Sequence, residues 1–129
     1  MKRLFIALVL CLFISTIPVN IFCSIPKNSE KKLIDKYEFI AKKAATEYSV
    51  NWTILYSIFY NESKLKSNAV GDKGKAIGLG QVHLKSAKEH YDSNITKKAL
   101  FDPIENARAC AAILKDYLKH EKDKTRLIL

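Results

Sequence analysis

The sequence predicts an all-α fold, and three observations carry that prediction. Apolar residues recur at the three-and-four spacing of helices through most of the chain after residue 28. No segment shows the sustained alternation of apolar and polar residues that is typical of a half-buried strand. The 129 residues leave room for one domain, and a hydrophobic content of 48% supports a packed core and excludes a mostly disordered chain.

Residues 1–24 are expected to form a signal peptide or a membrane anchor. Met1–Arg3 is a short positive region, eleven non-polar residues follow in Leu4–Ile14, and polar residues and a proline then break the run. Three interpretations stay open: cleavage after Cys23, lipid attachment to Cys23, and an uncleaved membrane attachment through residues 4–25. Each of them implies an exported protein of the periplasm or cell envelope.

The balance of charge favours a partner with a negative or strongly polar surface. Lys and Arg total 22 against 13 Asp and Glu, so the formal net charge is +9. This charge also permits nucleic acid as a partner. Because the expected export segment opposes that reading, we predict no nucleic-acid partner.

Cysteine and histidine usage implies neither a disulfide nor a metal site. Cys110 is the one cysteine that follows residue 24, so it has no internal pair and is expected to pack as a small hydrophobe. The three histidines, His83, His90 and His120, lack metal-ligand spacing with any other Cys or His. We therefore expect no metal and no other cofactor.

The first two predicted helices follow the expected export segment. One starts with Ser29 as its N-cap and carries the apolar stripe Leu33, Ile34, Tyr37, Ile40, Ala41, Ala44, Ala45 and Tyr48. The next has Asn51 as its N-cap and ends between Tyr60 and Lys66.

Two further helices are predicted in the second half of the chain. A short one covers Leu84–Tyr91, and a longer one starts with Asp102 as N-cap, Pro103 at the first helical position and Glu105 three residues after the cap. Thr125 is expected to cap a new helix. The apolar stripe of the longer helix is Ile104, Ala107, Ala111, Leu114 and Leu118.

All four glycines of the chain fall within ten residues, at Gly71, Gly74, Gly78 and Gly80. Glycine supplies positive φ angles and lets another group approach the backbone closely. The cluster therefore marks either a tightly turned loop or a loop that contacts a ligand, and position alone does not separate the two. The spacing is not that of a dinucleotide or phosphate-binding loop.

Glu62 stands just before this loop, near the end of the second predicted helix. Ile58 and Phe59 lie four and three residues before it, on the same helix face, and the helix C-terminus carries partial negative charge. Both features disfavour the ionised carboxylate, so the pKa of Glu62 is expected above its ordinary value. Such an environment suits the general acid of a glycoside-cleaving site. A solvent-exposed glutamate at a helix end is the alternative.

Five segments of the chain resemble a known family in their order and approximate spacing. They are Tyr60–Ser63, Asn68–Val70, Ala76–Gln81, Ser86–Ala87 and Asp102–Ala107. Together they resemble the lytic transglycosylase domain of the soluble (SLT) type, a goose-lysozyme-like family. The resemblance implies a lysozyme-like helical catalytic domain over residues 29–129. It also implies an exported enzyme that cuts peptidoglycan glycan strands between N-acetylmuramic acid and N-acetylglucosamine, with a secretion apparatus or a phage as a candidate association.

Carried over residue by residue, the resemblance makes Glu62 the catalytic acid and base. The implied substrate-binding residues are Ser63, Gly78, Leu79 and Gln81. A single carboxylate suffices for a reaction that closes a 1,6-anhydro ring, whereas ordinary hydrolysis needs a second one. Asp72 is the candidate second acid, although a role as a turn former is the alternative.

The chain departs from the family pattern at several positions. Gly80 stands where members more often have Met, Gly71 where many have a sugar-contacting Ser, and Cys110 where Gly is usual. Members also continue into a helix with Ala-Tyr-Asn, whose Tyr points at the catalytic Glu, whereas this sequence stops at Leu129. The expectation is therefore a C-terminally truncated domain that is weakly active or inactive alone. A lysozyme-like hydrolase and a catalytically inactive glycan-binding remnant are the alternative functions.

Overall fold

The computed structural model describes residues 28–128, and their side chains as far as Glu121. The predictions for residues 1–24 lie outside the described residues. Four α-helices make up most of the described part: α2 (Asn28–Tyr48), α3 (Trp52–Ser63), α4 (Leu84–His90) and α5 (Pro103–Ile128). Within these bounds, no helix is both long and apolar enough to cross a membrane.

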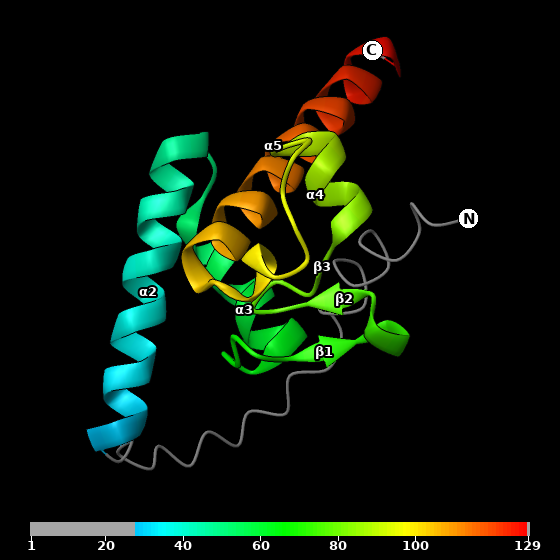
Figure 1. Cartoon of the computed structure of the whole chain (residues 1–129). Coiled ribbons are helices and arrows are strands. Elements are labelled where there is room, and N and C mark those ends of the chain that lie inside the picture. The colour runs from blue at the N-terminus through cyan, green and yellow to red at the C-terminus, as the bar shows by residue number, and fades with distance from the viewer. Residues whose placement is uncertain (1–27, 129) are drawn as a thin grey trace.

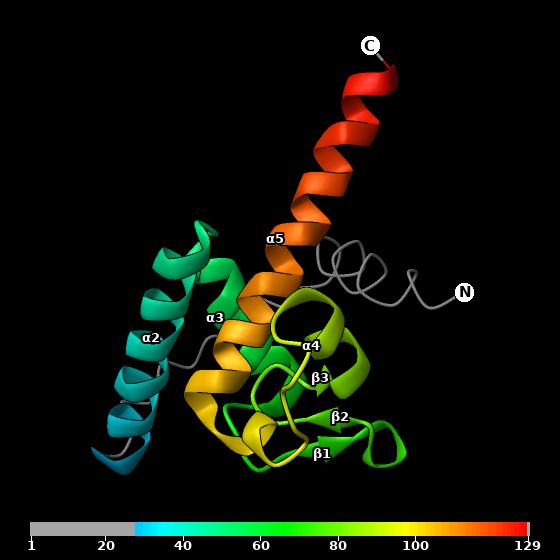
Figure 2. The ribbon, with the colours of Figure 1, turned by 45° about the horizontal axis from the view of Figure 1, so that its top comes forward.

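Helix α5 is the central element, and the other helices pack around its first half. Helix α2 packs against α5 on one side and also contacts α3, while α4 packs against α5 on the other side (Figure 1). The last turns of α5 extend beyond the rest of the fold (Figure 2). The predicted helical architecture is thus confirmed for the described residues.

A small antiparallel sheet lies between α3 and α4, which the sequence did not predict. Its strands are β1 (Val70–Gly71), β2 (Ala76–Ile77) and β3 (Val82–His83), in the order β1-β2-β3. Ile77 pairs with Val70 on one side and with Val82 on the other. Strands of two residues are too short to show an alternating pattern, so periodicity could not detect them. A 3₁₀ turn, η1 (Asp72–Gly74), joins β1 to β2.

The hydrophobic core joins the helices to the loop that contains the glycines. Burial of a Leu, Ile or Phe side chain contributes about 1.5–3 kcal/mol, so the large buried residues supply much of the stability. The largest fully buried side chains come from α3, the sheet region, the 3₁₀ turn η2 (Ala99–Phe101) and α5; they are Phe59, Leu55, Ile77, Leu79, Leu100 and Asn106.

The predicted N-caps of α3 and α5 are confirmed. Asn51 Oδ1 accepts a hydrogen bond from Thr53 N at 2.8 Å. Asp102 Oδ1 accepts from the backbone N–H groups of residues 104 and 105, at 2.9 and 3.0 Å. Glu105 does not reach back to this cap. Its carboxylate instead accepts from Tyr91 Oη at 2.6 Å and from Arg108 Nη1 at 3.0 Å, which ties the segment after α4 to α5.

Three boundary or burial expectations differ from the structure. Helix α2 begins at Asn28, so Ser29 lies inside its first turn rather than at the cap. Leu33, Ile34 and Ile104 were expected in apolar stripes but are exposed, at 41%, 36% and 41%, because each lies in the first turns of a helix, where few elements cover it. No new helix begins at Thr125, since α5 continues through it to Ile128.

Candidate active site

Glu62 lies in the last turn of α3, where a left-handed turn ends the helix. Lys64 and Leu65 have φ angles of 54° and 63°, and Lys64 N donates to Tyr60 O at 3.0 Å. Such φ angles are uncommon for residues other than glycine and are retained where surrounding contacts demand them. The turn redirects the chain toward β1, so Glu62 stands at the junction of the helix and the sheet.

The Glu62 side chain is exposed, yet its neighbours remove part of its hydration. This desolvation raises the pKa of the Glu62 carboxyl above its ordinary value, which is the direction that the sequence predicted. Burial, and then the nearby charge of Glu62, raise the pKa of the Cys110 thiol to about 12. Cys110 is buried as predicted, and α3, which carries Glu62, packs against α5, which carries Cys110.

Two glycines press directly against α5 and the turn before it. Gly78 has a φ of 72°, and a Cβ there would collide with the amide of Asn106 and lie 2.7 Å from Leu100 O. A Cβ on Gly80 would lie 2.9 Å from Cys110 Sγ. No larger residue fits either position without displacing its neighbours, so close approach explains these glycines.

Gln81 folds its side chain back over the loop. Its backbone has a φ of 47°, and its Nε2 donates to Gly78 O at 3.0 Å. Its Oε1 occupies the space that a Cβ on Gly71 would take. Gly71 thus makes room for the amide of Gln81, while the predicted sugar contact of Gln81 stays a prediction.

Ser63 and Leu79, two other predicted substrate-binding residues, lie beneath the surface. Ser63 Oγ donates to Phe59 O at 3.0 Å and accepts from Lys66 N at 3.2 Å, so the hydroxyl helps to close the end of α3. Leu79 is fully buried in the core. Ser63 and Leu79 thus take part in the packing around the site, and their predicted contacts with a sugar stay predictions.

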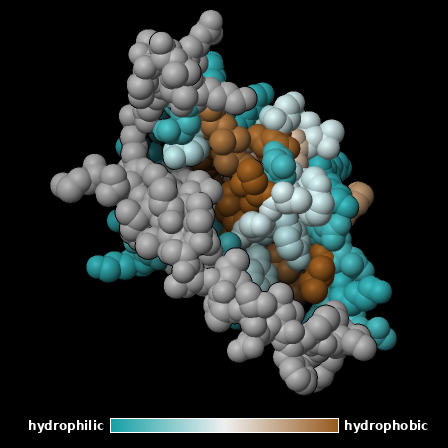
Figure 3. All heavy atoms as spheres, turned by 180° about the vertical axis from the view of Figure 1, so that it is seen from behind, coloured by the Kyte–Doolittle hydropathy of each residue, from teal (hydrophilic) through white to brown (hydrophobic). Residues whose placement is uncertain are grey.

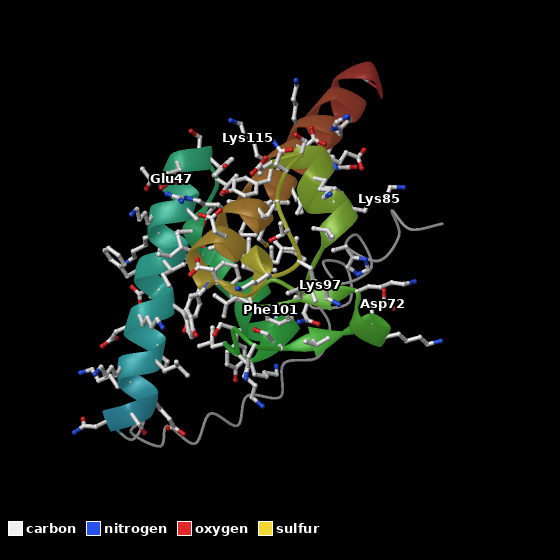
Figure 4. The ribbon with its side chains drawn as sticks, in the orientation of Figure 1. Glu47, Asp72, Lys85, Lys97, Phe101 and Lys115 are labelled. Carbon is white, nitrogen blue, oxygen red and sulfur yellow. The ribbon has the colours of Figure 1, made fainter. Side chains whose placement is uncertain are left out.

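Asp72 lies at the turn between β1 and β2, as Figure 4 shows. Its carboxylate is 3.4 Å from His83 Nε2, and both side chains are about half exposed, at 55% and 43%. Its φ is 45°, and its carbonyl accepts from Lys75 N at 3.1 Å. Asp72 therefore serves as a turn residue, and a role as a second acid stays a prediction.

Asn106 is the residue of this region to which the sequence analysis gave no role. Its side chain is fully buried and binds the backbone on both sides of Gly78. The available signal was a polar residue directly before Ala107 in the apolar stripe of α5. That signal was ambiguous because a polar residue in the first turns of a helix is ordinarily exposed.

Two further features of the surface are a depression and an apolar band. A shallow depression between α2 and α5 is lined by residues that include Phe39 and Ile104, and by none of the predicted site residues. An apolar band crosses the face opposite to that of Figure 1 (Figure 3). Among the side chains that the structure describes, no group of three or more His, Cys, Asp or Glu is placed to hold a metal ion.

Comparison with protein families decides the identity of the domain. The family model described as "Transglycosylase SLT domain" matches residues 39–129, which include Glu62, the glycine loop and Asn106. The chain belongs to the SLT transglycosylase family. The SLT domain is thus of the transglycosylase and lysozyme-like class that acts on peptidoglycan. A comparison with curated protein sequences gave no match.

Proposed function

We propose that this SLT domain is a lytic transglycosylase, which cleaves the glycosidic bond between N-acetylmuramic acid and N-acetylglucosamine and leaves a 1,6-anhydro end. The observation that carries the proposal is the Glu62 carboxyl. It is accessible at the end of α3, and desolvation raises its pKa. A raised pKa favours the protonated carboxyl, which can give its proton to a leaving oxygen and later take one back.

In the proposed reaction Glu62 acts twice. The protonated carboxyl first gives its proton to the glycosidic oxygen as the bond to the anomeric carbon of the muramic acid breaks. The resulting carboxylate then takes the proton of the 6-hydroxyl of the same sugar. The 6-oxygen forms a bond to the anomeric carbon, the ring closes, and Glu62 returns to its protonated form. No water is consumed, and atoms and protons balance over the two steps.

The position of Asp72 favours this one-carboxylate route over hydrolysis. An ordinary glycosidase holds two carboxyl groups on either side of the bond that it cleaves. Asp72 lies at the turn of the hairpin with its carboxylate beside His83, whereas Glu62 lies in the last turn of α3. The two acids come from different elements, and the turn role of Asp72 supports a role for Glu62 without a partner acid.

The charge of the chain also agrees with a peptidoglycan substrate. The formal net charge is +9, and the peptide stems of peptidoglycan carry carboxylates. We propose export to the cell envelope, because the apolar segment within residues 1–24 has the composition of a signal or anchor. Association with a secretion apparatus or a phage is a further proposal that rests on the family resemblance.

Mass spectrometry of peptidoglycan digested by the purified chain tests the proposed reaction. After borohydride reduction, an anhydro end should be about 20 Da lighter than the reduced end that hydrolysis would leave, because one water and two hydrogens are missing. Reduced ends as the main product would indicate a lysozyme-like hydrolase and direct attention to Asp72. Binding to the wall without any product would indicate an inactive glycan-binding domain.

A further inference from the structure

Asn106 places a polar side chain in the core beside the candidate active site. It is 0% exposed and ranks among the largest fully buried side chains, all the others of which are apolar. A buried amide is tolerated only where hydrogen bonds replace those it made to water. The partners of Asn106 therefore indicate what the residue does.

All three hydrogen bonds of the Asn106 side chain go to the backbone. Its Oδ1 accepts from Gly80 N at 2.8 Å. Its Nδ2 donates to Ile77 O at 2.8 Å and to Leu100 O at 2.7 Å. The side chain thus binds the glycine loop on both sides of Gly78, and it joins that loop to η2.

This set of partners requires the particular chemistry of an asparagine amide. One acceptor must face an N–H group and two donors must face carbonyl oxygens, which a carboxylate cannot supply and an apolar side chain lacks. Gly78 completes the fit, because a Cβ at that position would collide with the amide. Asn106 and Gly78 are therefore matched in shape as well as in hydrogen bonding.

The same face of α5 links the loop to Glu62. Cys110 lies one helical turn after Asn106 and fills the space next to Gly80. Its Sγ is 2.9 Å from the position that an added Cβ on Gly80 would take. The charge of Glu62 acts on this thiol. Asn106 and Cys110 together hold the Gly78–Gln81 backbone against α5, and α5 also packs against α3, the helix that carries Glu62.

We infer that Asn106 is a positioning residue, which holds the Gly78–Gln81 backbone in register with the Glu62 carboxyl so that a bound glycan is aligned for proton transfer. The inference rests on the proposed function. Asn106 itself stays in the core and touches no substrate. Small displacements of a supporting residue can reduce turnover strongly while the fold survives, because the reaction depends on alignment.

Asn106→Asp is the main test, because the change preserves shape and the acceptor that faces Gly80 N. At neutral pH the new carboxylate faces two carbonyl oxygens and cannot donate to them. We expect kcat on purified cell walls to fall by about 10- to 100-fold with a much smaller change in KM. As the pH falls, the aspartic acid gains a proton that it can donate, so the ratio of variant to wild-type kcat should rise.

Leu114→Ala is the matched control on the same helix. Leu114 is buried, lies two turns beyond Asn106 and takes no part in the hydrogen bonds and close approaches that hold the glycine loop. The Leu114→Ala variant should have a lower melting temperature than the wild type, while the ratio of its kcat to that of the wild type stays independent of pH. Wild-type kcat in folded Asn106→Asp, or a ratio that does not change with pH, would overturn the inference.

A measurement on the wild-type chain covers the case in which the variant does not fold. Hydrogen exchange of the Gly80 amide should be strongly slowed, because Asn106 Oδ1 accepts its proton. Fast exchange at Gly80 would overturn the inference without any variant. If the wild-type chain releases no glycan product, the proposed function fails, and the Gly80 amide alone then decides whether Asn106 orders the loop.

Discussion

The hairpin region between α3 and α4 has two ends that differ in packing. The base, at Gly78 and Gly80, is tightly packed, and the tip, at Asp72 and Gly74, is loosely packed. At the base, Gly78 and Gly80 lie against Asn106 and Cys110, and no Cβ fits at either glycine. At the tip, Asp72 is exposed with a φ of 45°, and a Cβ on Gly74 would have Lys97 Nζ, at 4.0 Å, as its nearest neighbour from elsewhere in the chain.

The difference shows that one cluster of glycines serves two purposes. At the tip, glycine permits the backbone conformation of a turn, and residues close in the sequence are enough to form that turn. At the base, glycine serves close packing against residues about 26 to 30 positions later in the chain. The base packs against α5, and α3 with its Glu62 packs against the same helix, so we expect substitutions at the base to have the larger effects.

The largest effect is expected for Glu62→Gln compared with Asp72→Asn. The amide is nearly isosteric with the acid but cannot give and recover a proton, so digestion of purified cell walls should fall by about 100- to 10,000-fold. Asp72→Asn should retain activity within a few fold, since Asp72 lies at the tip. Similar losses in the two variants, measured by release of soluble glycan, would show that the tip takes part in the chemistry.

Gly78→Ala and Gly74→Ala compare base and tip in stability. Both glycines have positive φ, at 72° and 87°, so both variants acquire backbone strain. Only Gly78→Ala also collides with Asn106, and it should cost about 3 kcal/mol or more of unfolding free energy, against about 1 kcal/mol for Gly74→Ala. Urea denaturation measures both losses of unfolding free energy, and equal losses would contradict tighter packing at the base than at the tip.

Gly80→Ala tests the contact between the loop and Cys110. The added methyl would lie 2.9 Å from Sγ, and overpacking of this kind costs about 1–3 kcal/mol. Cys110→Ala removes the sulfur, so the double variant should recover about 0.5 kcal/mol or more of that cost. The cycle compares the unfolding free energies of the wild type, the two single variants and the double variant. Additive losses would mean that the added methyl and the Cys110 sulfur do not compete for the same space.

The smallest effect expected is the pH dependence of stability at Glu62. Its pKa is raised in the folded chain from an ordinary value of 4.5, so the unfolded chain loses this proton first as the pH rises. The stability that the protonated group contributes is complete below pH 4.5 and is lost as the pH passes through the raised pKa. Glu62→Gln should therefore gain slightly in melting temperature relative to wild type at pH 7, and the gain should vanish near pH 4.

The sequence by itself determined the local features of this protein. Asn51 and Asp102 cap their helices with side-chain oxygens that reach only two or three residues along the chain, so their roles could be read directly. The direction of the Glu62 pKa shift was predictable for a similar reason, because apolar residues one helical turn away were visible in the pattern.

Only the tertiary structure decided how the base of the hairpin is built. Asn106 binds a backbone N–H that lies 26 residues earlier, and Cys110 fills the space beneath the same glycine. Periodicity has no information on such pairs, because they form only when α5 packs across the loop. The three short strands were missed for the same reason, since their pairing comes from the folded loop and not from an alternating pattern. The helices follow from local rules, and the alignment of the glycine loop with Glu62 follows from packing.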